Sequence, residues 1–325
     1  MSDLLSRDVL SRPQPGGGGP SRLERVMVAF DGSESSRAAA ALAFELAAGR
    51  GARLTLVHVL ELPDLSPDTV QVAPGIERLI ELTEEDWRGR LAGLAAEAPA
   101  EASVDTAVIR AEKAAPGLLE LLGSRGGDVL VAGTHGVGGL KRQLLGSVSQ
   151  QLLAHAPCSM LLVRDVPRLS GPRSVVAAVD GSETSSSVVA MAQAAAVALS
   201  AQLVLAHVAD EHVPFASPDV TRALRESARE QGRRILDRAR AQVAAPLETV
   251  LDELREGWTR EQLVALCEER QPIVAVVGST GRHGFKGLLV GSTAQHLVNH
   301  APCPVLVART EHAPGGSPSS WVERT

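Results

Sequence analysis

An internal duplication is the feature that most constrains how this chain can fold. The tetrapeptide at 133–136 (Gly, Thr, His, Gly) follows an apolar run and precedes, after nine residues, the pair Gly146 and Ser147. The tetrapeptide at 278–281 (Gly, Ser, Thr, Gly) follows another apolar run and precedes, after nine residues, Gly291 and Ser292. At ordinary residue usage, three glycines and a hydroxyl at fixed spacing arise at about one start in 10⁴. Two occurrences in equivalent settings indicate a repeated unit of strand, glycine-rich loop and helix.

The segments around the two loops repeat in the same order. Asp31 follows the apolar run 26–30 and Asp180 follows the run 175–179, at an offset of 149 positions that also relates His58 to His207. The offset between the glycine loops is 145, because the second copy lacks four residues. Since apolar strands alternate with helical segments in both copies, the sequence predicts βαβ units and parallel sheets.

Length and loop composition divide the chain into two domains. At 325 residues it is long enough for two domains of ordinary size. We expect one domain over 23–166, a linker over 167–172 and a second domain over 173–310, with disordered Gly- and Pro-containing tails over 1–22 and 311–325. Each domain is predicted to be an α/β unit with an open five-stranded parallel sheet. The expected strand order is 3-2-1-4-5, flanked by helices in a Rossmann-like arrangement.

Charge and composition argue against several classes of partner, location and site. A formal net charge of −6 argues against nucleic acid or an anionic membrane surface as the main partner. No apolar run approaches the ~20 residues needed to span a bilayer, and residues 1–22 lack the apolar core of a secretory signal. Three scattered cysteines form neither a disulfide framework nor a metal-ligand spacing. We therefore expect a cytoplasmic protein without a metal site of its own.

Two of the repeated signals converge on one place in the predicted sheet. In a sheet of this order, ligands bind beyond the carboxyl ends of the first and fourth strands, where the strand order reverses. Asp31 and Gly133 end those strands in the first copy, and Asp180 and Gly278 end them in the second. Glycine permits close backbone approach, and the N-terminus of the following helix favours phosphate. A carboxylate beside phosphate implies a ribose contact or a bridging Mg²⁺.

With these motifs the chain resembles tandem universal stress proteins, in particular the ATP-binding branch of that family. The resemblance covers about residues 23–165 and 173–310 and implies an adenine nucleotide alpha hydrolase-like fold. It implies ATP, ADP or AMP as the ligand, with Mg²⁺ where phosphates bind. In the first copy it assigns the site to Asp31, Val59, Gly133, Gly136, Gly146, Ser147 and Val148. In the second copy it assigns the site to Asp180, Val208, Gly278, Gly281, Gly291, Ser292 and Thr293. Val59 and Val208 match the residue whose backbone contacts the adenine edge.

The two copies differ, and the signals also have purely structural explanations. Glu112 aligns with Gly257 after the third strand, where a carboxylate would repel phosphate, so we favour the second site slightly. The glycines could only shape a tight loop, and the aspartates could only form helix-capping turns. Candidate phosphate neighbours within the nine-residue spacers are Lys141, Arg142, Arg282 and Lys286.

Histidines and cysteines outside the loops are assigned no chemistry. His58 and His207 end apolar strands and are expected to be buried and hydrogen-bonded. His155 and His300 fall in the last turn of a helix, where a cation complements the helix dipole. The cysteines are expected to be inert small hydrophobic residues, namely Cys158, Cys267 and Cys303.

Three functions remain open on the sequence alone. The leading hypothesis is a nucleotide-binding regulator of a stress response, with an unknown protein partner. A slow ATPase is the second, because no Walker A motif, catalytic base or arginine finger is found. An interaction module without a ligand is the third. The apolar last strands, 160–163 and 305–308, would be sheet edges that proteins normally cover. The resemblance implies that they pair the two halves as an internal pseudo-dimer, and a two-fold dimer of whole chains is compatible with this.

Overall fold

The computed structural model describes residues 23–62, 75–136, 145–164, 173–210, 217–244, 247, 249–281 and 290–310. The expected tails and the expected linker, 1–22, 311–325 and 167–172, lie outside these residues. Within the described part, no helix combines the length and the apolar character that crossing a membrane requires.

The first half alternates strands and helices in the predicted order. Its elements are β1 (Arg25–Ala29), α1 (Glu34–Ala48), β2 (Arg53–Glu61), α3 (Ile76–Ala95), β3 (Ser103–Ala111), α4 (Ala114–Arg125), β4 (Val129–Gly133), α5 (Ser147–His155) and β5 (Ser159–Val163). Helix α1 begins after Ser33, whose side chain accepts a hydrogen bond from the Ser36 N–H at 3.1 Å. A serine N-cap of this kind satisfies one of the N–H groups that the first helical turn leaves unpaired.

The second half repeats this order. Its elements are β6 (Ser174–Ala178), α6 (Thr184–Ala198), β7 (Gln202–Ala209), α7 (Pro218–Arg240), β8 (Val250–Glu256), α8 (Thr259–Arg270), β9 (Val274–Gly278), α9 (Ser292–His300) and β10 (Val305–Ala308). Helix α7 begins with Pro218 at its first position, after the N-cap Ser217. Proline suits that position because its ring presets the helical φ and no N–H is lost there.

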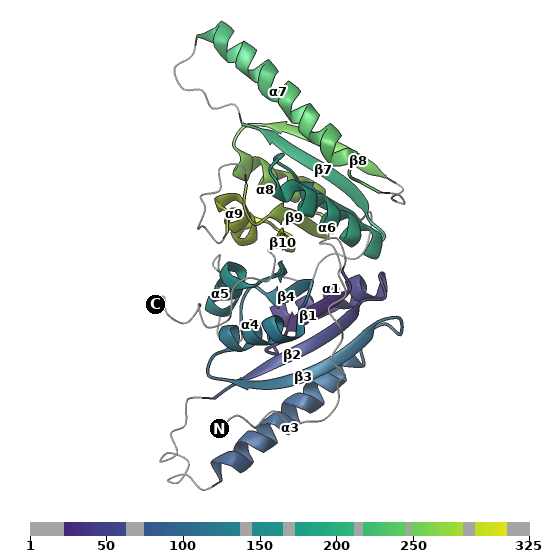
Figure 1. The fold of residues 1–325 in the computed structure, drawn as a ribbon, viewed down its shortest axis with the longest axis vertical. Helices are drawn as coiled ribbons and strands as arrows, with labels where there is room; N and C mark the ends of the chain where they lie inside the picture. The colour runs from purple at the N-terminus through teal and green to yellow at the C-terminus, as the bar shows by residue number, and fades with distance from the viewer. Residues whose placement is uncertain are drawn as a thin grey trace.

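Within the described residues, the strands of both halves form one ten-stranded sheet (Figure 1) in the order β3-β2-β1-β4-β5-β10-β9-β6-β7-β8. Each half keeps the predicted order 3-2-1-4-5 with parallel neighbours. The halves meet where β5 pairs antiparallel with β10, with Leu161 opposite Leu306. Both strands are buried along their whole length. The last strands thus pair the two halves, as the sequence predicts, and cover edges that would otherwise be exposed.

Helices cover both faces of the sheet and enclose two core layers. One core lies between the sheet and helices α1, α3, α6 and α7, and the other lies under α4, α5, α8 and α9. Val26 and Val28 of β1 belong to the first core and Met27 to the second, as the alternation of a pleated strand requires. Both cores continue across the junction of β5 and β10. The long helices α3 and α7 lie at the two outer ends of the molecule (Figure 1).

The topology brings two loops together at the carboxyl edge of each half. β1 pairs with β4 up to Ala29 and Ala132, and β6 pairs with β9 up to Ala178 and Val277. The loop that carries the aspartate and the loop that carries the glycines therefore begin side by side. This is the place where the strand order reverses.

Candidate functional site

The aspartates after β1 and β6 form the same turn. Asp31 Oδ1 accepts a hydrogen bond from the Ser33 N–H at 3.0 Å, and Asp180 Oδ1 accepts one from the Ser182 N–H at 2.9 Å. In the second half, Ser185 Oγ also donates to Asp180 Oδ1 at 3.0 Å. These bonds hold each carboxylate at the edge of the sheet. The side chain that caps α1 belongs to Ser33, so Asp31 shapes the turn before the helix.

The second glycine of each loop faces that carboxylate. A Cβ on Gly136 would lie 2.9 Å from Asp31 Oδ2, and a Cβ on Gly281 would lie 2.9 Å from Asp180 Oδ2. A side chain at either position would therefore push the carboxylate out of place. The close approach is possible because glycine has no Cβ.

The first glycine of each loop faces the start of a helix. A Cβ on Gly278 would lie 2.7 Å from Thr184 Oγ1, and a Cβ on Gly133 would lie 2.9 Å from the Ser36 nitrogen. Thr184 Oγ1 donates to the Thr280 carbonyl oxygen at 2.6 Å, which ties the start of α6 to the glycine loop. The glycines do shape a tight loop, and that loop forms one wall of the site.

The ends of each nine-residue spacer are drawn together by the backbone. The Gly146 N–H donates to the Thr134 carbonyl oxygen at 2.8 Å, and the Gly291 N–H donates to the Ser279 carbonyl oxygen at 2.6 Å. His135 Nε2 is buried without a hydrogen-bond partner among the described residues. The candidate phosphate neighbours in the spacers lie outside the described residues, and they are Lys141, Arg142, Arg282 and Lys286.

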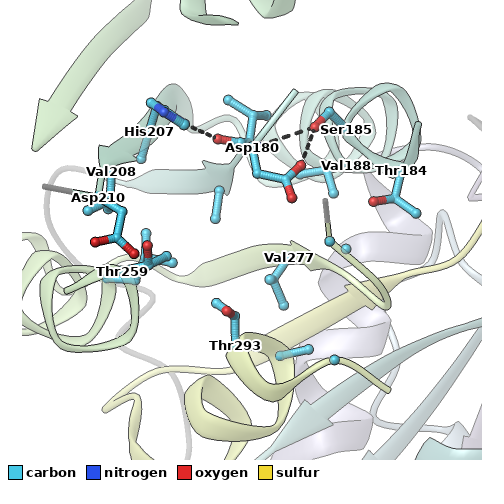
Figure 2. Close-up of a pocket in the computed structure, with 18 of the residues that line it drawn as sticks. Asp180, Thr184, Ser185, Val188, His207, Val208, Asp210, Thr259, Val277 and Thr293 are labelled. Atoms are coloured by element: carbon cyan, nitrogen blue, oxygen red, sulfur yellow. Dashed lines mark hydrogen bonds between the residues drawn. The ribbon is translucent and has the colours of Figure 1, made fainter. Parts of the chain in front are cut away.

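In the second half these loops border a cavity of about 530 Å³. Its apolar wall includes Val179, Val208, Leu263 and Val277, and its polar wall includes the glycine loop and the hydroxyl side chains. Figure 2 shows Asp180 and Thr293 on opposite sides of the cavity. A volume of this size, with an apolar wall and a few converging polar groups, is typical of a small-molecule site.

Three helices begin at this cavity. Thr184 is the first residue of α6, Thr259 is the first of α8, and Ser292 is the first of α9, and all three line the cavity. Helix N-termini present unpaired N–H groups and the positive end of the helix dipole, so they favour anions. The carboxylates of Asp180 and Asp210 also line the cavity. The site therefore offers both anion-binding backbone and oxygen ligands for hydroxyl groups or a cation.

All seven residues that the sequence singles out in the second half line this one cavity: Asp180, Val208, Gly278, Gly281, Gly291, Ser292 and Thr293. In the first half, the contacts above bring together Asp31, Gly133, Gly136 and Gly146. Ser147 is the first residue of α5. Val59 and Val148 are partly buried and pack against the core beneath α4 and α5.

The two strand-end histidines are buried and hydrogen-bonded, as expected. His58 Nδ1 lies 2.8 Å from the Phe30 carbonyl oxygen, and His207 Nδ1 lies 2.7 Å from the Val179 carbonyl oxygen. Because a carbonyl oxygen only accepts, Nδ1 carries the hydrogen in both rings. Burial is the main cause that lowers the pKa of His58 below its ordinary value. The neutral ring is therefore the form that this environment favours.

The cysteines lie outside the site. Burial raises the pKa of Cys158 to about 11. A hydrogen bond to the Cys267 thiol, together with burial, raises the pKa of Cys303 well above its ordinary value. Thiols held in their neutral form are poor nucleophiles.

Comparison with known proteins identifies the fold and the repeat. The model of the Universal stress protein family matches residues 22–164 and again residues 172–309. The chain belongs to the universal stress protein family. It is a tandem member, since both halves match.

Its relatives include other two-domain universal stress proteins. The chain is similar to Universal stress protein Rv2623 of Mycobacterium tuberculosis, with 30% identity over 296 residues that cover 87% of this chain and 96% of the relative. A universal stress protein of Mycolicibacterium smegmatis is 29% identical over the same shares of the two chains. A universal stress protein structure from Archaeoglobus fulgidus has a TM-score of 0.60 at 18% identity, over 88% of this chain and 98% of that one. That likeness concerns the fold.

Sequence reasoning missed a residue that packs beside the first-half site of this universal stress protein. Glu112 is exposed, and its counterpart Gly257 is not among the described residues that line the cavity. Trp87 of α3, by contrast, lies directly against the turn that follows β1. Aligning α3 with α7 at the offset of the glycine loops would have placed Trp87 opposite Gly232, a signal that was available in the sequence.

Proposed function

We propose that this universal stress protein binds ATP, ADP or AMP at a glycine-loop site and acts as a nucleotide-dependent regulator of a stress response. The observation that carries the proposal is the cavity of about 530 Å³, where a glycine loop and three helix N-termini face an apolar wall. A nucleotide matches the two walls of this cavity, because it has a flat apolar base at one end and phosphates at the other. Anions are favoured at helix N-termini, and an apolar wall favours the base.

The lining residues suggest how the nucleotide lies. The start of α9, with Ser292 and Thr293, would receive phosphate oxygens, because its N–H groups are unpaired within the helix. Val208 and Ala209, at the end of β7, would contact the base. Asp180 Oδ2, which faces Gly281, would accept from a ribose hydroxyl or hold Mg²⁺. Mg²⁺ in proteins commonly uses one or two carboxylates together with phosphates of the ligand.

The position of α9 supports a regulatory role. Helix α9 begins at the cavity with Ser292, and its last turn contacts the other half of the chain. There the carbonyl oxygens of Val298 and Asn299 accept hydrogen bonds from Arg164. A ligand that moves or rigidifies one end of this nine-residue helix would therefore affect the junction of the halves. Such a link between two places is what a ligand-dependent switch requires.

The test begins with freshly purified protein. We expect denaturation to release adenine nucleotide, which chromatography and mass spectrometry identify and quantify per chain. After removal of that nucleotide, Mg-ATP at a hundredfold excess over its Kd is expected to raise the free energy of unfolding by about 2.7 kcal/mol. Isothermal titration calorimetry gives the Kd directly.

A pair of glycine variants controls for nonspecific effects. Gly281→Ala is expected to weaken binding, since its Cβ would lie 2.9 Å from Asp180 Oδ2. Gly89→Ala adds a Cβ that meets no atom within 4 Å, so it should leave binding unchanged. Steady phosphate release that Gly281→Ala removes would favour the ATPase alternative. No released nucleotide and no stabilisation by Mg-ATP would contradict the proposal and favour an interaction module without a ligand.

A further inference from the structure

In the first half, an indole ring packs against the strand end and the turn whose counterparts border the cavity of the second half. Trp87 of α3 stacks on His58, with ring centroids 3.5 Å apart and planes at 12°. It meets Phe30 edge-on at 6.4 Å. Its Cη2 atom lies 3.3 Å from where a Cβ on Gly32 would be, next to Asp31. Trp87 thus packs against the strand end, the turn and the histidine that border the site.

The second half has a glycine at the corresponding place. A Cβ on Gly232 of α7 would lie 3.0 Å from His207 Cδ2, so Gly232 and Trp87 both contact the strand-end histidine of their half. The numbering agrees, because Trp87 and Gly232 are related by the offset of 145 that relates the glycine loops. Such a Cβ would also lie 2.6 Å from Leu254 Cδ1, so α7 approaches the strands closely at Gly232 and carries no ring there.

One ion pair in each half supports the same alignment of the helices. Glu84 on α3 pairs with Arg110 on β3, and Arg229 on α7 pairs with Glu256 on β8. Each pair joins the long helix to the outermost strand of its half. Glu84 and Arg229 are also 145 positions apart, although the signs of the charges are reversed. The two long helices therefore sit on their strands in the same register.

The cavity of the second half extends under α7 at this level. Ala228 and Gln231, which lie four residues and one residue before Gly232, line it together with His207, Val179 and Asp180. In the first half, Phe30 takes the place of Val179. The rings of Phe30 and Trp87 thus add bulk at two positions where the second half has small side chains. In a chain with 2% aromatic residues, two rings at one site are a marked concentration.

We propose that the two nucleotide sites are unequal: the second half binds the ligand, and Trp87 fills the matching part of the first half. This inference rests on the proposed function and names which copy of the site performs it. A ligand entering the first half must displace an indole that stacks on His58 and has the Arg90 guanidinium 4.9 Å from its centroid. The free-energy cost of displacing the indole makes the binding free energy of the first site less favourable, so its affinity is lower.

The test uses the duplication as its own control. Nucleotide-free full-length protein is titrated with Mg-ATP by isothermal titration calorimetry, and one equivalent per chain is expected. Asp180→Asn is expected to weaken binding by at least about tenfold, the size of one lost hydrogen bond to a charged group. The same substitution at the matching position, Asp31→Asn, is expected to leave the Kd and the stoichiometry unchanged.

The outcomes separate the two proposals. Two equivalents in the wild type, or a loss caused equally by Asp31→Asn, would overturn the inequality and leave nucleotide binding intact. A complete absence of binding would remove the proposed function and the inequality with it.

Opening the first half provides the converse test. Combined Trp87→Ala and Phe30→Val substitutions give the first half the small side chains of the second, and a second equivalent of nucleotide is expected. Adding Asp31→Asn to this variant should remove that second equivalent. If the variant with Trp87→Ala and Phe30→Val has the circular dichroism of the wild type but still binds only one equivalent of nucleotide, the role assigned to Trp87 is overturned.

Discussion

The guanidinium of Arg164 donates a 2.6 Å hydrogen bond to the carbonyl oxygen of Asn299 in the other half of the chain. Arg309 makes the reciprocal contact with the Leu153 carbonyl oxygen, also at 2.6 Å. Arg164 follows β5 and Arg309 follows β10, so the antiparallel pairing of these strands carries each arginine into the opposite half. Both arginines reach the last turn of a helix, where orphan carbonyl groups and the helix dipole favour a cation.

These reciprocal caps are expected to stabilise the junction. Arg164→Ala and Arg309→Ala should each lower the free energy of unfolding by about 1–3 kcal/mol, because buried carbonyl groups lose a charged donor. Denaturant unfolding followed by circular dichroism measures the change. Arg222→Ala removes an arginine whose ion pair with Asp219 is solvent-exposed, so a change below about 0.5 kcal/mol is expected there. Equally small changes in the free energy of unfolding for all three substitutions would contradict a capping role of Arg164 and Arg309.

Burial of His58 predicts a pH dependence of stability. Since the pKa of His58 is lowered in the folded protein, the folded state binds fewer protons than the unfolded state. The contribution to stability is complete above the ordinary pKa of 6.5 and is lost as pH falls through the lowered value. Between about pH 7.5 and about pH 5.5, the free energy of unfolding should therefore fall less steeply in His58→Asn than in the wild type. Leu54→Ala, which removes no titratable group, should keep the wild-type slope.

Cysteine reactivity should follow burial. In a variant with Cys267→Ser and Cys303→Ser, the remaining Cys158 has a pKa raised to about 11 from 9.0. At pH 8 this change alone lowers the thiolate fraction by about a hundredfold. We expect a thiol reagent such as dithionitrobenzoate to label the native protein at least that much more slowly than the protein unfolded in denaturant. Fast labelling under native conditions would show that Cys158 is accessible.

Two tryptophans are expected to report differently on the ligand. Trp258 is 55% exposed and immediately precedes Thr259, which lines the cavity of the second half. Trp87 lies in the first half, stacked on His58. In a Trp321→Phe background, any change in tryptophan emission on adding Mg-ATP should therefore persist in Trp87→Phe and disappear in Trp258→Phe. The opposite result would locate the ligand in the first half.

The duplicated order of strands, glycine loops and helices was predictable from the sequence, because apolar runs, capping residues and glycine spacings are local signals. The sequence predicts a long helix from about residue 76 and a short helix from residue 259, and the structure has α3 beginning at Ile76 and α8 at Thr259. The position of the crevice also followed, since parallel topology alone brings the loop after Asp180 beside the loop after Gly278.

Only the tertiary structure decided what packs against the strand-end histidine in each half. Helices α3 and α7 hold the same place in the repeat, but their packing against the sheet determines that Trp87 stacks on His58, whereas α7 approaches His207 closely at Gly232. The reach of Arg164 to Asn299 likewise depends on the register of β5 and β10. Contacts of this kind join residues far apart in the chain. Their geometry is set by how whole elements pack, which no local pattern of residues specifies.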